Sequence, residues 1–416
     1  MDVKNILFLV SLIIFLGYLA EWLFKKINIP DTLLLIVVGF IIGPNVLNYI
    51  DPHALGTLAP LFTTFTLLFL MFDGALSIDL RSFAEGIGAG ITIGFSIFFV
   101  SAVVIAGIFY FLLYDPLLSL MLGFSLGGVS SAFIIPLLKQ IKVDKKLYSI
   151  LTLESALTDV LSIVFAITMM ELKILNVIEI KTIFSEIASL FFVAGMLGIL
   201  AGFLWIFLEN KQIIEEDRNY MMTIAYVVLL YFITEYLGGN GAIAAMCFGI
   251  VIANSKIMIS MAQKIKRPKK KVKKETQEEK PGKIINVVSR RERMFYQEIS
   301  FFLKTFFFVY IGLLLNIKNL KAVGIGSGIA VAILLLRYVS LLFTKNYKKP
   351  DRMLVNSLFA RGIAPAAIML MAMEKQLLMD QTIIDVVYFI ITATIILSSL
   401  RVFFYKLKIK KPSSTE

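Results

Sequence analysis

Long apolar segments follow one another along the 416-residue chain, separated by short stretches rich in charge, proline, asparagine or glycine. A helix that crosses a bilayer needs about 20 mostly apolar residues, so this pattern predicts about thirteen spanning helices. They cover approximately residues 3–24, 31–49, 57–77, 87–113, 116–138, 148–170, 184–208, 219–237, 240–257, 296–316, 322–344, 353–374 and 382–404. The predicted fold class is therefore an all-α polytopic membrane protein.

The composition supports a membrane protein and excludes several other classes. Hydrophobic residues make up 58% of the chain and charged residues 17%, whereas soluble domains average about 45–50% and 25%. A water-soluble enzyme, a disordered protein and a disulfide scaffold are therefore excluded. The single histidine, His53, falls in a predicted outer loop, and the sequence has no metal-ligand cluster or nucleotide motif. We therefore expect neither an enzyme nor a resident cofactor.

The distribution of positive charge predicts the orientation of the chain in the membrane. An outer N-terminus and a cytoplasmic C-terminus place 32 of the 41 Lys and Arg residues on the inner side, as the positive-inside rule requires. Residues 262–293 form a basic cytoplasmic loop, expected to lie near anionic lipid headgroups, and residues 405–416 form a short cytoplasmic tail. Nucleic acid is not an expected partner, because no recognition fold or aromatic platform accompanies the basic loop.

Two pairs of segments resemble each other across the basic loop. GFIIGPN at 39–45 resembles GIVIAN at 249–254, and TLLFLMFDGALSI at 66–78 resembles TFFFVYIGLLLNI at 305–317. The matched spans run in opposite predicted directions, which indicates an inverted repeat. Transporters built this way bind substrate near the membrane midplane, where broken helices meet.

The predicted domain organisation follows from this repeat. One transmembrane domain covers residues 1–404, with inverted repeats at about 1–170 and 219–404, linked by span 184–208.

Ionisable side chains inside predicted spans are the candidate functional residues, because each costs about 2.5–3.5 kcal/mol to insert. The informative set comprises Asp73, Glu154, Asp159, Arg337 and Arg361. Three acids and two arginines leave at least one acid available for a role other than a structural ion pair.

Helical geometry separates the two acids of span 148–170. Glu154 and Asp159 are five residues apart, about 140° around a helix, so they cannot serve the same point. Ser155 and Asp159 are four residues apart and share a face. We therefore predict that Glu154 pairs with Arg337 as a buried brace, and that Asp159 is the exchangeable site.

Two spans contain residues that interrupt helices. Gly127 and Gly128 lie in the middle of span 116–138, and Gly362 and Pro365 lie in span 353–374. Backbone groups freed at such interruptions can face an ion.

Arg361 and Lys304 also lie inside predicted spans, and each needs a partner or a route to water. Arg361 either neutralises helix dipoles in the crossing region or pairs with an acid. Lys304, near the inner end of its span, is expected to extend its ammonium group to the membrane surface.

Several segments together resemble the sodium/proton antiporters of the NhaP/NHE type. They are residues 28–45, 69–80, 151–160, 240–254, 306–317, 336–340 and 359–364, in the same order as in the family. Among them, ESALTD at 154–159 is similar to the family's Glu-Ser-x-x-Asn-Asp signature. The resemblance implies a thirteen-helix fold, a homodimer in the cell membrane, and alternating access around broken helices five and twelve.

The resemblance also implies roles for individual residues. Asp159 would be the ion- and proton-binding carboxylate, with Ser155 as a neighbouring ligand and Asp73 as a second acid near the ion. Glu154 and Arg337 would occupy the family's buried salt-bridge positions. The crossing region would contain Gly127, Gly128, Ser131, Arg361 and Gly362.

The chain departs from the family pattern at two places. Val129 and Ser130 stand where the family usually has Thr-Asp, and Thr158 stands where it has Asn. The first departure replaces a carboxylate with a hydroxyl. Ser130 and Ser131 together also resemble potassium-efflux antiporters.

These observations predict secondary transport by competition for one carboxylate. Asp159 would hold either a proton or a monovalent cation, with Na⁺ favoured and K⁺ as the alternative, because hard cations prefer oxygen ligands. With no second acid beside Asp159, we expect electroneutral exchange of one proton per cation, although Asp73 complicates that count. A channel-like or regulatory module, in which Asp159 only gates, is the alternative from another class.

Overall fold

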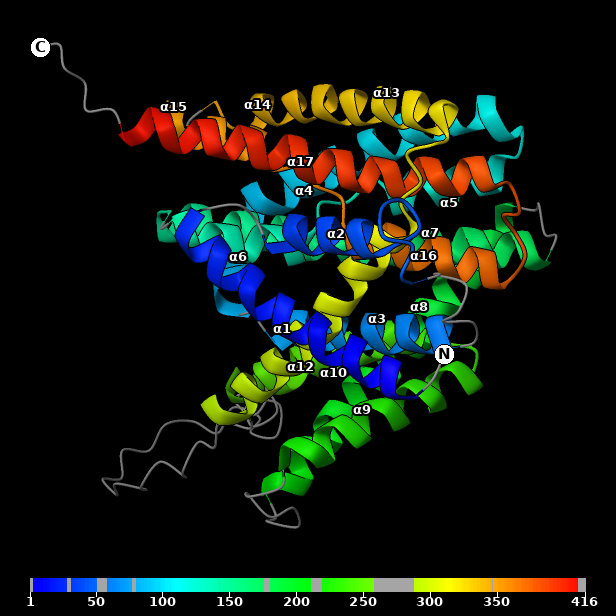
Figure 1. The fold of residues 1–416 in the computed structure, drawn as a ribbon. Coiled ribbons are helices and arrows are strands. Elements are labelled where there is room, and N and C mark those ends of the chain that lie inside the picture. The colour runs from blue at the N-terminus through cyan, green and yellow to red at the C-terminus, as the bar shows by residue number, and fades with distance from the viewer. Residues whose placement is uncertain are drawn as a thin grey trace, which may run out of the picture. The chain divides into compact units, whose positions relative to one another are not determined.

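The computed structural model describes residues 3–27, 31–50, 58–76, 80–141, 143–175, 180–210, 219–257, 288–345 and 347–410. All regular elements in these ranges are helices (Figure 1). Six of the described helices are long and apolar enough to cross a membrane, and seven shorter apolar helices accompany them. The fold class predicted from the sequence is thus confirmed, whereas the number of thirteen spans stays a prediction.

The chain divides into two compact units. The first contains residues 1–67, 84–184 and 301–416, and the second contains residues 68–83 and 185–300. The helices wholly or mainly in the first unit are α1 (Val3–Ile27), α2 (Asp31–Ile42), α4 (Leu80–Leu113), α5 (Pro116–Ser125), α6 (Ser131–Ile141), α7 (Lys145–Leu175), α13 (Leu320–Leu336), η3 (Arg337–Val339), α14 (Ser340–Phe343), α15 (Lys349–Ser357), α16 (Ile363–Glu374) and α17 (Gln381–Lys410).

The second unit has its own aromatic core. It contains α9 (Asn219–Tyr236), α10 (Gly241–Ala253) and most of α8 (Ile180–Asn210), while α3 (Leu58–Leu76) and α12 (Arg290–Leu314) are shared with the first unit. The Phe72 ring lies 5.9 Å from that of Phe248 and 5.3 Å from that of Tyr296. All three side chains are buried, so they hold the end of α3, α10 and the start of α12 together.

Two predicted spans are interrupted in the first unit. The first gives α5 and α6, which are separated by residues 126–130, and the second gives α15 and α16, separated by residues 358–362. Pro365 does not cause the second interruption. It lies in the first turn of α16, where its missing N–H has no helical partner to lose.

Several predicted boundaries are wrong by a few residues. α17 continues to Lys410, so the predicted tail begins inside a helix, and α12 begins at Arg290, within the predicted basic loop. The predicted single span 322–344 agrees with one continuous candidate span, Leu320–Phe343, in which α13 passes through the 3-10 turn η3 into α14. His53, residues 258–287 and residues 411–416 lie outside the described residues.

Two long helices organise the first unit. α7 packs against α5, α6 and α16, and α17 packs against α13, α15 and α16. Figure 1 shows α17 running beside α13. The first interruption lies beside α7, because α5 and α6 both pack on that helix. The second lies beside α7 and α17, because α16 contacts both.

Glycines allow two pairs of helices to touch backbone to backbone. A Cβ atom on Gly39 of α2 would lie 2.0 Å from the Val309 carbonyl oxygen of α12. A Cβ on Gly249 of α10 would lie 2.9 Å from the Phe72 carbonyl oxygen of α3. Gly39 and Gly249 are the glycines matched in the sequence repeat, and each contacts a helix of the other predicted repeat. The inverted repeat itself stays a prediction.

An ion pair and a helix cap join the start of α5 to the end of α7. Asp115 accepts a hydrogen bond from the Leu118 amide at 3.0 Å and forms an ion pair with Lys173. Burial raises the pKa of the Asp115 carboxyl, but the hydrogen bonds from Leu118 and Lys173 outweigh burial. The pKa therefore lies below its ordinary value.

Candidate cation site at the crossing of two interrupted helices

The Asp159 carboxylate lies at the N-terminus of α6. Its Oδ2 atom accepts hydrogen bonds from the Ser131 amide, at 2.9 Å, and from the Ser131 hydroxyl. Ser131 is the first residue of α6, so the carboxylate faces the positive end of the helix dipole. Within the described residues, Oδ1 accepts no hydrogen bond from the protein, and the side chain is only part-buried. One oxygen is therefore anchored while the other is available to a proton or a cation.

Thr158 supports the same interruption from the neighbouring position of α7. The Val129 amide donates to the Thr158 hydroxyl oxygen at 3.0 Å, and that hydroxyl donates to the Ser155 carbonyl at 3.2 Å. A backbone amide freed by an interruption must find such a partner inside a membrane. Thr158, which replaces the family's asparagine, thus satisfies the backbone of the interrupted segment.

Arg361 binds the end of α5. Its Nη1 atom donates to the carbonyl oxygens of Gly127, at 2.9 Å, and of Gly128. These carbonyls directly follow the C-terminus of α5, the negative end of that helix dipole. The sequence left two roles open for Arg361, neutralising a helix dipole or pairing with an acid. Its hydrogen bonds to the carbonyls after α5 fit the first role. The side chain is 2% exposed, and its charge is therefore held in place.

The two interrupted segments contact each other directly. The Ser130 amide donates to the Ala360 carbonyl at 2.9 Å. A Cβ atom on Gly362 would lie 2.1 Å from the Ser130 hydroxyl oxygen, so only glycine fits there without a shift of Ser130. Backbone groups of one interruption are thus satisfied partly by the other.

Glu154 and Arg337 form a buried ion pair apart from Asp159. Arg337 Nη1 and Nη2 each donate to a Glu154 carboxylate oxygen, the second at 3.1 Å, and Arg337 Nε donates to the Val355 carbonyl at 3.0 Å. Both side chains are 1% exposed. The pair joins α7 to η3 and α15, and it is sealed from solvent, unlike the part-buried Asp159.

Two other predicted site residues have different surroundings. Ser155 lies on the Asp159 face of α7 and is fully buried, but its hydroxyl donates to the Thr152 carbonyl at 3.1 Å. Asp73 is part-buried and belongs to the second compact unit. The contacts described within the first unit therefore comprise Asp159, the residues of the two interruptions and Thr158.

Sequence analysis missed a polar stripe on α17. The Thr394 hydroxyl oxygen accepts a hydrogen bond from the Arg361 amide at 3.0 Å. The Ser398 hydroxyl donates to the Ser357 carbonyl at 2.6 Å. Arg401 Nη1 lies 3.5 Å from the Asn356 amide oxygen. Thr394, Ser398 and Arg401 follow the i, i+4, i+7 spacing of one helix face. That spacing, within an apolar helix, is the signal that could have identified them.

Lys304 forms an ion pair that the sequence did not predict. Its ammonium nitrogen lies 2.7 Å from Asp31 Oδ2, and the two side chains are 13% and 7% exposed. The negative charge at the first residue of α2 attracts the lysine inward, which the prediction overlooked because it considered span 296–316 alone.

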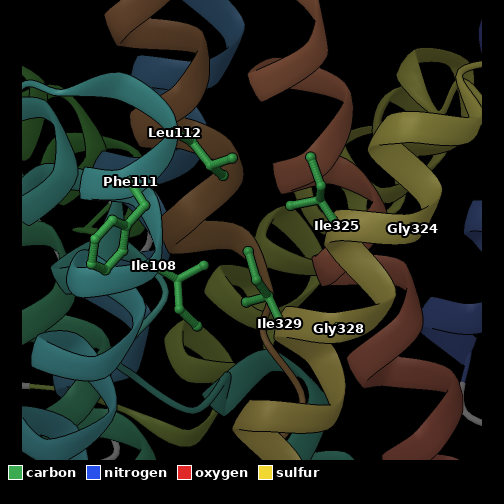
Figure 2. A pocket seen from close by; sticks show the side chains of 7 residues that line it. All are labelled: Ile108, Phe111, Leu112, Gly324, Ile325, Gly328 and Ile329. Atoms are coloured by element: carbon green, nitrogen blue, oxygen red, sulfur yellow. The ribbon is translucent and has the colours of Figure 1, made fainter.

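An apolar groove lies between α4 and α13, and its lining differs from the polar lining of the cation site. It encloses about 350 Å³, and its lining residues are Ile108, Phe111, Leu112, Gly324, Ile325, Gly328 and Ile329. Figure 2 shows Ile108 and Leu112 facing Ile325 and Ile329 across it. Because these side chains offer a cation no oxygen ligand, the groove is not a second cation site.

The sequence matches a known family of transporters over almost its whole length. A family model described as the transmembrane sodium/hydrogen exchanger matches residues 11–406. The chain belongs to the sodium/hydrogen exchanger family. It is therefore a multi-pass membrane transporter that exchanges Na⁺ for H⁺.

Two relatives carry names that agree with this family. The chain is 24% identical over 385 residues to "Probable Na(+)/H(+) antiporter 2" of Methanocaldococcus jannaschii, covering 86% of this chain and 84% of that protein. It is 25% identical over 240 residues to an uncharacterized Na⁺/H⁺ antiporter of Schizosaccharomyces pombe, covering 52% of this chain and 40% of that protein.

The fold is similar to that of a solved antiporter. The structure of the sodium proton antiporter MjNhaP1 from Methanocaldococcus jannaschii at pH 8 matches with a TM-score of 0.74 and 18% identity, over 99% of both chains. An electron-microscopy structure of MjNhaP1 matches with a TM-score of 0.69 and 19% identity, over 99% of this chain and 100% of that one.

Proposed function

We propose that the exchanger works by competition between H⁺ and Na⁺ for Oδ1 of Asp159. The observation that carries this proposal is the asymmetry of the carboxylate. Oδ2 is held by the amide and hydroxyl of Ser131, whereas Oδ1 accepts no hydrogen bond within the described residues. A carboxylate fixed through one oxygen keeps its position while the other oxygen exchanges a proton for a cation.

The remaining cation ligands are oxygen atoms near this carboxylate. We assign Ser155, Ser130 and the Val129 backbone as ligands, since hydroxyls and carbonyls suit a hard monovalent cation. Thr158 holds the Val129 amide, and so keeps the interrupted segment beside Asp159.

The exchange is electroneutral on this proposal. Glu154 is the acid of α7 nearest to Asp159 in the sequence, and its charge is balanced by Arg337. Asp159 alone then carries one proton or one cation per cycle. Asp73 belongs to the second unit, and on this proposal it does not exchange a proton of its own.

The wider setting follows from charge and from the family. The exchanger lies in the cell membrane with its N-terminus outside and its C-terminus in the cytoplasm, and it works as a homodimer by alternating access. Anionic lipid headgroups are the proposed partner of the basic loop at 262–293, most of which lies outside the described residues. The two repeats, about 1–170 and 219–404, form the transport domain. No resident cofactor takes part, because the ions are the substrates.

The proposal is tested in proteoliposomes with an internal pH dye. Outward or inward Na⁺ gradients should drive opposing proton flux in the parent protein and in Asp380→Asn, which removes an exposed acid outside the site. Asp159→Asn should abolish that flux while remaining folded. Continued Na⁺-driven proton flux in Asp159→Asn contradicts the proposal.

The same vesicles decide the cation and the class of transport. Li⁺ and K⁺ are tested beside Na⁺ across a pH series, and a preference for K⁺ would identify the potassium alternative. A cation flux that neither saturates nor responds to an opposing proton gradient would identify a channel-like protein.

A further inference from the structure

The two interrupted helices are held by equivalent threonines. The Val129 amide donates to the hydroxyl oxygen of Thr158 on α7, and the Arg361 amide donates to that of Thr394 on α17, both at 3.0 Å. Each amide lies two residues before the second half-helix, which begins at Ser131 in α6 and at Ile363 in α16. The same contact therefore occurs at the same position of both interruptions.

Both threonines use their hydroxyl groups in the same way. Thr158 donates to the carbonyl of Ser155, at 3.2 Å, and Thr394 donates to that of Ile391, at 3.0 Å. Each acceptor lies three residues earlier in the same helix. The two side chains are 1% and 0% exposed. Each hydroxyl thus accepts from the interruption and can donate to its own helix. The Thr158 hydroxyl also lies 3.4 Å from the Val129 carbonyl oxygen, a second acceptor that belongs to the interruption itself.

The two halves differ in the charge that accompanies this contact. Beside Thr158 the first half carries Asp159, where the second half has Ile395 beside Thr394. At the held amide the first half has the apolar Val129, where the second half has Arg361. The first half therefore supplies the exchanging carboxylate, and the second half supplies a fixed guanidinium group.

We propose that Thr394 is a positioning residue for cation exchange, acting through Arg361. The inference rests on the proposed role of Asp159. Thr394 fixes the Arg361 backbone, and the Arg361 guanidinium binds the carbonyls of Gly127 and Gly128. Three residues beyond Gly128, Ser131 holds Asp159. A shift of Arg361 is therefore transmitted along a short, buried segment to the cation-binding carboxylate.

The hydroxyl is removed with little change of shape in Thr394→Val. This variant leaves the buried Arg361 amide without its acceptor. We expect the apparent KM for Na⁺ to rise about tenfold, which corresponds to about 1.4 kcal/mol, the order of one buried hydrogen bond. The maximal rate per folded protein should change less than about twofold. Thr394→Ser keeps the hydroxyl and should retain the parent KM.

Thr392→Val is the matched control. The Thr392 hydroxyl is also buried on α17, but it donates to the Tyr388 carbonyl of its own helix, at 3.0 Å. It holds neither interruption, so its removal should leave the KM unchanged. A structural loss of stability alone would lower the amount of folded protein without changing the KM.

The experiment separates failure of this inference from failure of the proposed site. KM and maximal rate are measured in proteoliposomes for the parent, the three threonine variants and Asp159→Asn, with folded protein counted by size-exclusion chromatography. Flux retained in Asp159→Asn overturns the proposed site and with it this inference. If Asp159→Asn is inactive, a parent-like KM in Thr394→Val, or an equal rise in Thr392→Val, overturns the inference alone. A Thr394→Val protein that does not fold leaves the decision to Thr394→Ser, which must match the parent KM.

Discussion

The buried pair between Glu154 and Arg337 should behave as one energetic unit in a double-mutant cycle. The perturbation is Glu154→Met, Arg337→Met and the double variant, because methionine fills a similar volume without charge. Each single change leaves a charge buried without its partner. The double change removes both charges together.

The structure gives the expected magnitudes. Both side chains are 1% exposed, and removing one partner of such a pair typically costs about 3–5 kcal/mol. Arg337→Met also leaves the Val355 carbonyl without the Arg337 Nε donor, which adds about 1–3 kcal/mol. The double variant should cost less than the two single variants together, with a coupling energy of at least about 2 kcal/mol.

Unfolding is followed by circular dichroism during denaturation in detergent, and the free energy of unfolding is compared among the four proteins. Arg337→Met should be the least stable and the double variant more stable than it. Costs that add within about 0.5 kcal/mol would refute the reasoning, because independent side chains behave that way.

Three further changes probe other parts of the fold. Gly39→Ala should destabilise the protein by about 1–3 kcal/mol through its clash with α12. Gly324→Ala, at a position with open space around it, should stabilise the protein by up to about 1 kcal/mol. Equal shifts of the melting temperature in the two variants would contradict this. Lys304→Met should lower the free energy of unfolding by about 3–5 kcal/mol, because it leaves Asp31 unpaired. Adding Asp31→Asn should recover part of that loss. A further loss of stability in the double variant argues against the ion pair. Because the folded-state pKa of Asp115 is lowered, its contribution is present at neutral pH and is lost as pH falls through that lowered value. Asp115→Asn should therefore reduce the melting temperature at pH 7 and converge with the parent in acid, and a pH-independent difference would exclude this charge effect.

Helical spacing was enough to predict the main acids of the site. Glu154 and Asp159 lie about 140° apart on one helix, and the structure places Glu154 against Arg337 and Asp159 against Ser131. The interruption after α5 was also predictable, because two adjacent glycines stand in the middle of an apolar run. These are local patterns, which a single helix reveals.

Long-range contacts explain what the sequence did not show. Arg361 binds backbone carbonyls 233 and 234 residues away, and carbonyls have no signature in a sequence. The second interruption lies before Pro365, and its position depends on contacts with α17. The Thr394 hydroxyl accepts from the Arg361 amide, and the Ser398 hydroxyl donates to the carbonyl of Ser357 at the end of α15. Lys304 pairs with an acid 273 residues away, so its own apolar segment misled the prediction.

Cation-driven proton release from purified protein tests the central claim most directly. The detergent-solubilised exchanger is held in a weakly buffered solution with a pH indicator, and NaCl is added against a choline chloride control. The parent protein and Asp380→Asn should release protons in proportion to saturation by Na⁺, because the cation displaces a proton from Asp159. Folded Asp159→Asn should release none. Proton release of parent size from Asp159→Asn would contradict the assignment of Asp159 as the group that exchanges H⁺ for Na⁺.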